Sequence, residues 1–131
     1  MANKNPEDRK YAESHEWIKV SNGDGTCGIT DHAQELLTDI VFVELPEKGK
    51  KIKKGDRVAV VESVKSVSDI YSPVSGEITA VNEKLNDSPE LINSDPFGEG
   101  WIFTISLDDK AELSTLLSSV DYEKTLEGEN A

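Results

Sequence analysis

Several residue types that carry chemistry are scarce in this chain of 131 residues. It has one cysteine, Cys27, and two histidines, His15 and His32. A single cysteine excludes an internal disulfide and fits a reducing compartment. Neither histidine has a neighbour at a metal-ligand spacing, and no zinc pattern is present. The sequence therefore predicts no metal site.

Long apolar runs and an excess of positive charge are also missing. No run approaches the ~20 apolar residues of a membrane span. The formal net charge is −12, which makes nucleic-acid binding improbable because the basic footprint is lacking. The N-terminal residues show no signal-peptide or transit-peptide character. Together with an intact Met1, this favours a bacterial cytoplasm over a mitochondrial matrix.

Catalytic equipment is scarce as well. The chain has no glycine-rich phosphate loop and no Walker pattern. Nothing in the sequence near Cys27 lowers the pKa of its thiol, so we expect a small buried hydrophobic residue there. The 26 acidic residues reflect composition and define no dyad. We therefore expect no catalytic residues, and a protein that is not itself an enzyme.

What the chain does contain is a series of short strand patterns. Its length fits one domain over residues 1–131, with a core at about 11–122, a short N-terminal arm and an acidic C-terminal tail. β-branched and aromatic runs bounded by Gly, Pro, Asn and Asp predict strands at 17–20, 26–29, 40–45, 58–61, 76–81 and 101–107. Many short strands favour a compact barrel or sandwich, mainly β.

Two helices are expected at the edges of this β structure. Asp31 with Gln34, and Asp109 with Glu112, have capping-box spacing. Residues 86–100 are rich in Asn, Asp, Ser, Pro and Gly and predict a long irregular loop. The apolar positions of the two helices are Ala33, Leu36, Leu37 and Ile40 in the first, and Leu113, Leu116, Leu117 and Val120 in the second.

Lys65 is the most informative single residue. It stands between two β-branched stretches and is followed by a Ser-Pro-Val-Ser-Gly turn at 72–76, so a hairpin with Lys65 at or near its tip is predicted. An exposed primary amine at a fixed point suits a covalently attached carrier group, although a lysine there can also be only a solubilising charge. We expect Gly76 to meet a demand for positive φ after Pro73.

Residues 62–76 (ESVKSVSDIYSPVSG) resemble the lipoyl-attachment segment of the glycine cleavage system H-protein family. Further motifs match that family in the same order, at 14–17 (SHEW), 28–34 (GITDHAQ), 41–46 (VFVELP) and 91–101 (LIN to GW). The match covers nearly the whole chain from about Tyr11 onward. Ser66 and Val67 stand where the family commonly has small residues such as Ala and Thr, which is a mild departure.

Two sister families also display a modified lysine on a hairpin. Biotinyl domains flank this lysine with methionine, whereas Val64 and Ser66 flank Lys65 here. Lipoyl domains of 2-oxo acid dehydrogenase acyltransferases place Asp before the lysine, and they lack the 86–101 loop and the final helix. The local sequence around Lys65 and the length of the chain therefore argue against both of these families.

The resemblance implies a barrel-sandwich hybrid fold (lipoyl/biotinyl-like), with a short internal helix and a C-terminal helix. It also implies lipoate in amide linkage to Lys65. In the family, glycine decarboxylase loads an aminomethyl group onto lipoate, aminomethyltransferase removes it, and dihydrolipoyl dehydrogenase reoxidises the carrier. A lipoate-attaching enzyme is a further implied partner. We expect a monomer, no nucleic acid and no membrane.

The resemblance also assigns site residues. Ser14, Glu16 and Asp69 match positions of a family cleft that shelters the loaded arm, and Glu16 with Asp69 is the expected pair for holding its cation. Glu62 is a candidate recognition element for the lipoylating enzyme. Each of these acidic residues could instead be a solvated charge, and Asp69 could also cap the hairpin.

A second function keeps Lys65 but needs no carboxylate-lined cleft. In it, an H-like lipoyl-relay protein donates lipoate to other lipoyl domains without serving glycine catabolism. The presence of Glu16 and Asp69 favours the glycine cleavage role. An unmodified barrel used only for protein contact is the third possibility.

Overall fold

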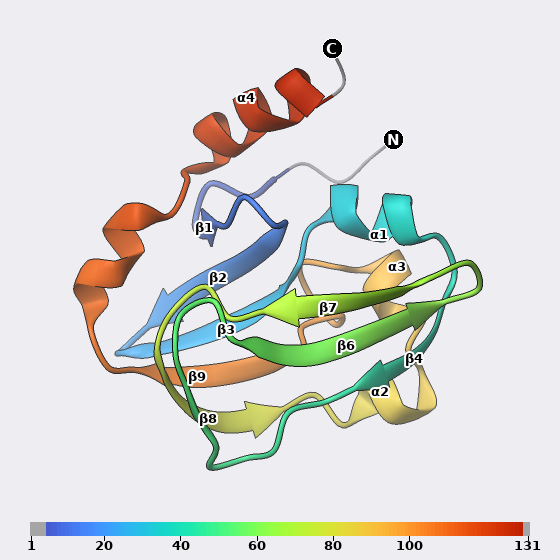
Figure 1. The fold of residues 1–131 in the computed structure, drawn as a ribbon, viewed down its shortest axis with the longest axis horizontal. Helices are drawn as coiled ribbons and strands as arrows, with labels where there is room; N and C mark the ends of the chain where they lie inside the picture. Colours follow the sequence, from blue (N-terminus) through green and yellow to red (C-terminus); the bar gives the residue numbers. More distant parts are fainter. Residues whose placement is uncertain (1–4, 130–131) are drawn as a thin grey trace.

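A computed structural model of the chain describes residues 5–129 (Figure 1). Among these residues, no helix has both the length and the apolar character needed to cross a membrane. The strands are β1 (Lys10–Tyr11), β2 (Glu16–Ser21), β3 (Asp24–Ile29), β4 (Ile40–Glu44), β5 (Lys51–Ile52), β6 (Arg57–Ser63), β7 (Val67–Tyr71), β8 (Gly76–Val81) and β9 (Phe103–Leu107). The helices are α1 (Asp31–Leu37), α2 (Lys84–Asp87), α3 (Leu91–Ser94), a 3₁₀ helix η1 (Lys110–Thr115) and α4 (Ser119–Glu129).

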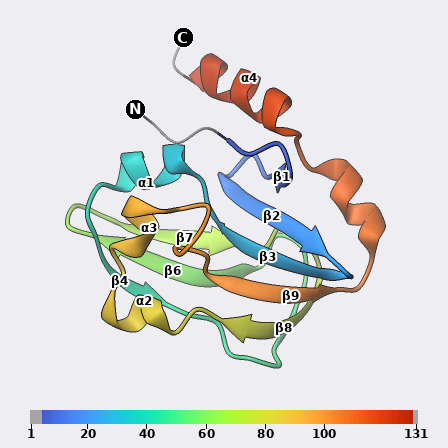
Figure 2. The same ribbon diagram turned by 180° about the vertical axis from the view of Figure 1, so that it is seen from behind.

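The strands form two sheets that face each other across the core (Figures 1 and 2). One has the order β1-β2-β3-β9-β8-β5 and the other β4-β6-β7, with antiparallel neighbours throughout. A single buried cluster takes side chains from both sheets, for example Ile29 and Ile105 from the first and Val43 and Val61 from the second. The predicted mainly β, barrel-sandwich architecture is confirmed.

Turn chemistry explains the first hairpin. Asn22 and Gly23 join β2 to β3 with φ values of 53° and 85°, the left-handed pair of a type I′ turn. Cys27 lies on β3 in the core with 1% of its surface exposed, and burial raises the pKa of its thiol. The expected small, buried, unreactive cysteine is confirmed.

The first helix begins and ends differently from the prediction. Thr30 is its N-cap, and the Thr30 hydroxyl accepts a hydrogen bond from the Ala33 N–H at 3.2 Å. Asp31 instead accepts from the Gln34 side chain at 2.9 Å, one residue inside the helix. The helix ends at Leu37, and Ile40 begins β4 rather than extending the helix.

The loop predicted at 86–100 contains ordered structure. The short helices α2 and α3 overlap or lie within it, and α3 supplies Asn93. The Asn93 amide accepts from the Ile40 N–H at 2.9 Å and donates to the Thr38 carbonyl at 2.8 Å. A side chain of the predicted loop therefore fixes the connection from α1 to β4.

The C-terminal segment is not one continuous helix. The Asp109 carboxylate caps the 3₁₀ helix by accepting from the Ala111 N–H at 2.9 Å, but the chain is extended at Leu117. Leu117 exchanges two backbone hydrogen bonds of 2.7 and 2.8 Å with Tyr11, which interrupts helical pairing before α4. The expected single apolar stripe is consequently broken, and Val120 is 54% exposed.

Gly76 corrects a second expectation, because it is absent from the positive-φ glycines of the described residues. The constraint at Gly76 is instead close packing against β9, where an added Cβ would lie 2.0 Å from the Ser106 carbonyl oxygen. We expect Gly76→Ala to lower the free energy of unfolding by roughly 1–3 kcal/mol, since β8 and β9 must separate. Urea denaturation measures this change.

Gly128 provides the matched control for that experiment. It lies in α4, and an added Cβ there would meet nothing within 4 Å. Alanine favours a helix over glycine by about 1 kcal/mol, so Gly128→Ala should leave stability unchanged or raise it. Equal loss of stability in both variants would contradict the packing explanation for Gly76.

Candidate functional site

Lys65 lies at the tip of the β6–β7 hairpin, as predicted. The turn is closed by the Ser63 N–H, which donates to the Ser66 carbonyl at 2.8 Å, and the Ser63 hydroxyl accepts from the Ser66 N–H at 3.1 Å. A third bond, from the Val64 N–H to the Asp39 carbonyl at 3.0 Å, ties the tip to the α1–β4 connection. Lys65 itself is exposed. A defined backbone thus holds a primary amine in solvent.

Glu62 lies on β6, three residues before Lys65. Its cross-strand neighbours are Phe42 on β4 and Val67 on β7. Phe42 is 50% exposed and Val67 is 65% exposed, while Glu62 is half-buried. The Glu62 carboxylate therefore lies between exposed apolar side chains and close to Lys65. An enzyme that modifies Lys65 would be able to contact it there. Its recognition role stays a prediction.

The fold brings Ser14, Glu16 and Asp69 together. All three line one cleft of about 110 Å³ between the turn before β2, helix α1 and strand β7. The apolar part of the wall comes from Ile29, Ala33, Leu36, Leu37 and Ile70. A small cationic group on an apolar stem matches such a lining.

Glu16 is the buried charge of this cleft, with 3% of its surface exposed. The Ser14 hydroxyl donates to one carboxylate oxygen, and the Tyr71 N–H donates to the other at 3.1 Å. Burial raises the pKa of Glu16 to about 7, although these two hydrogen bonds act in the opposite direction. The carboxylate gains its full charge only above neutral pH or when a cation lies beside it.

Asp69 differs from Glu16 in exposure and pairing. Its side chain is 43% exposed, and one carboxylate oxygen lies 3.7 Å from the Arg57 guanidinium. An exposed ion pair of this kind contributes at most about 1 kcal/mol. Asp69 therefore supplies a weaker, solvent-screened negative charge at the cleft.

The hairpin also links Lys65 to the cleft. Asp69 follows Lys65 by four residues along β7, which at ~3.3 Å per residue separates their Cα atoms by at most about 13 Å. The hairpin tip and the cleft therefore lie close together on the same hairpin.

The sequence reasoning missed three residues that line the cleft or contact its walls. His15 lines the cleft and has a φ of 77°. The Tyr122 hydroxyl forms a hydrogen bond with the His15 Nδ1 atom and a second one with the Thr30 hydroxyl. The rings of His15 and His32 lie 4.9 Å apart although they are distant in sequence. The only sequence signal was the position of His15 between two predicted site residues, because the contact with Tyr122 spans 107 positions.

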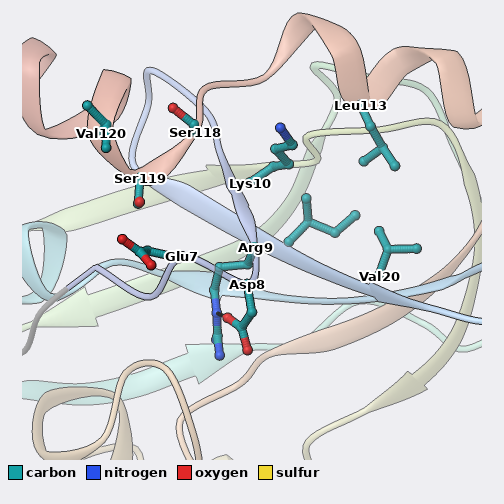
Figure 3. Close-up of a pocket in the computed structure, with 10 residues that line it drawn as sticks. Glu7, Asp8, Arg9, Lys10, Val20, Leu113, Ser118, Ser119 and Val120 are labelled. Atoms are coloured by element: carbon teal, nitrogen blue, oxygen red, sulfur yellow. Dashed lines mark hydrogen bonds and ion pairs between the residues drawn. The ribbon is translucent and has the colours of Figure 1, made fainter.

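A larger groove of about 480 Å³ lies elsewhere, between the N-terminal segment, β2 and the start of α4 (Figure 3). Within it, the Asp8 carboxylate contacts the Arg9 guanidinium at 2.9 Å and the Lys19 amine at 3.3 Å. Arg9 also stacks over Trp17, with its guanidinium carbon 4.6 Å from the ring centre. These contacts hold the N-terminal arm against the sheet, apart from the predicted site.

Comparison with known proteins identifies the family. The family model described as "Glycine cleavage H-protein" matches residues 9–129. The chain belongs to the glycine cleavage H-protein family. The glycine cleavage system H protein of Aeromonas hydrophila is 61% identical over 125 residues, covering 95% of this chain and 97% of that protein. The Photorhabdus laumondii H protein is 58% identical, covering 95% and 96%.

A solved structure agrees with this assignment. The crystal structure of a glycine cleavage system H protein from Mycobacterium marinum superposes with a TM-score of 0.87 at 37% identity. The superposed region covers 94% of this chain and 99% of the Mycobacterium marinum chain. The resemblance inferred from the motifs is confirmed at the level of family and fold.

Proposed function

We propose that this chain is one lipoyl-carrier domain that bears lipoate in amide linkage on Lys65 and is not itself an enzyme. In this role it shuttles the aminomethyl group from glycine decarboxylase to aminomethyltransferase, and dihydrolipoyl dehydrogenase restores its oxidised form. The observation that carries the proposal is the exposed Lys65 amine on a hairpin that leads directly to the Glu16 cleft. A bacterial cytoplasmic monomer that is loaded with lipoate by an attaching enzyme fits the same proposal.

The residues present fit such a group. Attached to Lys65, lipoate would supply a dithiolane, whose S–S bond can open to carry a group on one of its sulfur atoms. The Lys65 amine can form the amide, because it is a primary amine in solvent. Tethering to the hairpin raises the local concentration of the arm at the cleft to the millimolar range or above.

The cleft residues then protect the carried amine. The ammonium of an aminomethyl group needs a counter-charge and shelter from water, because water removes the group by hydrolysis. Glu16 offers a carboxylate that is already oriented by Ser14 and by the Tyr71 N–H, so little reorganisation is needed on binding. Asp69, which is more exposed, adds a second negative charge to the lining of the cleft.

Mass spectrometry tests the proposal. The protein is incubated with a lipoate ligase, ATP and lipoate, and then with glycine and glycine decarboxylase. A lipoyl mass on the peptide that contains Lys65, followed by an aminomethyl mass, is expected. Lipoylation without aminomethyl loading would favour the lipoyl-relay function, and no modification of Lys65 would overturn both.

Asp69→Asn is expected to shorten the half-life of the loaded aminomethyl group by about 2- to 5-fold. The exposed, Arg57-paired carboxylate can contribute no more than about 1 kcal/mol. The half-life is followed as formaldehyde released from the loaded protein. Arg57→Gln is the matched control, since it frees Asp69 from its partner and should leave the half-life unchanged or longer. A shorter half-life in Arg57→Gln would contradict this role for Asp69.

A further inference from the structure

One phenol outside the cleft connects two of its walls. The Tyr122 hydroxyl lies 2.7 Å from the His15 Nδ1 atom and 2.7 Å from the Thr30 hydroxyl. Tyr122 is fully buried, and its ring stacks on Tyr11 at 4.9 Å with an interplanar angle of 12°. The phenol is therefore held in place by packing, and its hydroxyl is directed at both partners.

The two partners belong to separate walls. His15 is part of the turn that carries Ser14 and Glu16, and its backbone has φ of 77°, which is uncommon for a residue with a side chain. Thr30 caps α1, which carries Ala33, Leu36 and Leu37 along the cleft. The Thr30 N–H also donates to the His15 carbonyl at 3.0 Å. The Tyr122 hydroxyl bridges the same pair through their side chains.

The bridge comes from the far end of the chain. Tyr122 lies in α4, and Figures 1 and 2 show α4 beside β1 at the edge of the six-stranded sheet, away from the Lys65 hairpin. Neither Tyr122 nor Tyr11 is among the residues that line the cleft. The Tyr122 hydroxyl therefore contacts the cleft walls through His15 and Thr30 without lining the cleft itself.

We propose that Tyr122 is a positioning residue of the carrier site, whose hydroxyl fixes the Ser14–Glu16 turn against α1 and so sets the geometry in which the cleft holds the aminomethyl ammonium. The inference rests on the proposed carrier function. It gives the C-terminal helix a role in retention of the carried group. A positive-φ histidine needs such an external restraint, because its own backbone preference opposes the observed turn.

Tyr122→Phe tests this inference, with Tyr11→Phe as the matched control. Both variants keep the ring stack and lose only a hydroxyl, and the Tyr11 hydroxyl donates to the Pro6 carbonyl at 2.6 Å instead of contacting the cleft walls. Each change should lower the melting temperature by a few degrees, about 4 °C per lost hydrogen bond. Measurements are made well below both melting temperatures.

The expected result separates the two variants. Tyr122→Phe should be lipoylated at the wild-type rate but lose the aminomethyl group about 3- to 10-fold faster, whereas Tyr11→Phe should retain it like wild type. The His15 ring ¹⁵N shifts should move in Tyr122→Phe and not in Tyr11→Phe, because only the former removes the Nδ1 partner.

The outcomes also distinguish this inference from the carrier proposal. Absence of aminomethyl loading in the wild type would overturn the carrier function and, with it, this inference. If the wild type loads and both phenylalanine variants retain the group equally, the positioning role alone is overturned. Shifts in His15 without faster loss would likewise overturn it, since the cleft would then tolerate a displaced turn.

Discussion

Replacing Lys65 with alanine is expected to abolish lipoylation and therefore every later step of the carrier cycle. The hairpin should stay intact in this variant, because its turn is closed by Ser63 and Ser66 and not by the lysine side chain. Lys65→Arg keeps the positive charge and most of the length. It should be equally inactive, since a guanidinium stays protonated and does not form the amide. Intact mass after incubation with a lipoate ligase measures the effect.

Another exposed lysine serves as control for this result. Lys84 begins α2 and pairs with Glu99 at 3.3 Å on the surface. Lys84→Ala should be lipoylated to the same extent as wild type, because a ligase that reads the hairpin does not depend on α2. Full lipoylation of Lys65→Ala at another lysine would contradict a position-specific attachment site. Loss in both variants would point to a surface-charge requirement.

The hairpin could be predicted from sequence because its causes are local. β-branched residues on both sides of Lys65 favour pleated strands, and the serines that close the turn, Ser63 and Ser66, are only three positions apart in sequence. The same holds for the Asn22-Gly23 turn, where two neighbouring residues decide the geometry. Contacts between residues that are close in sequence can be predicted without knowing the fold.

The cleft could be predicted only through the family resemblance. Glu16 begins β2 of the six-stranded sheet, Ser14 lies in the turn before it, and Asp69 comes from β7 of the other sheet, so no local pattern links them. The contact of Tyr122 with His15 depends on where α4 docks, and that docking follows from the strand-like pairing of Leu117 with Tyr11. The spacing of the apolar residues suggested a continuous helix in this segment, because such a pattern does not reveal that the Leu117 backbone pairs with Tyr11 instead.

Gly76 shows how a correct residue can be given a wrong reason. A glycine after a Ser-Pro-Val-Ser turn suggests positive φ, yet the constraint comes from the Ser106 carbonyl on the neighbouring strand β9. Similarly, Asp31 has the composition of an N-cap, but Thr30 takes that place and Asp31 binds Gln34. In both cases a contact with another residue sets the role of the residue, and the local sequence pattern does not describe that contact.

Glu16→Gln is expected to act in opposite directions on retention and stability. For retention, the variant keeps acceptors and donors for Tyr71 and Ser14 but loses the charge that pairs with the carried ammonium. A hydrogen bond to a charged group contributes about 1.5–3 kcal/mol, so the loaded group should be lost about 10- to 100-fold faster. Formaldehyde release from loaded protein measures this rate.

The effect on stability follows from the raised pKa of Glu16, about 7 against the ordinary value of 4.5. A carboxyl whose pKa is raised by folding stabilises the protein below the unfolded-state pKa. That contribution is lost as the pH rises through the folded-state pKa. Between about pH 4 and pH 8, wild type should therefore lose up to about 3 kcal/mol of unfolding free energy relative to Glu16→Gln, which does not titrate.

Urea denaturation of both proteins across this pH range provides the measurement. Asp69→Asn, at the half-exposed carboxylate of the same cleft that is paired with Arg57, is measured alongside as the control. A Glu16→Gln variant that retains the carried group like wild type would contradict the role of Glu16 as counter-charge. If Glu16→Gln loses the aminomethyl group faster and is more stable than wild type above neutral pH, the Glu16 carboxylate destabilises the protein when the cleft is empty. The ion pair with the carried ammonium then offsets this loss of stability.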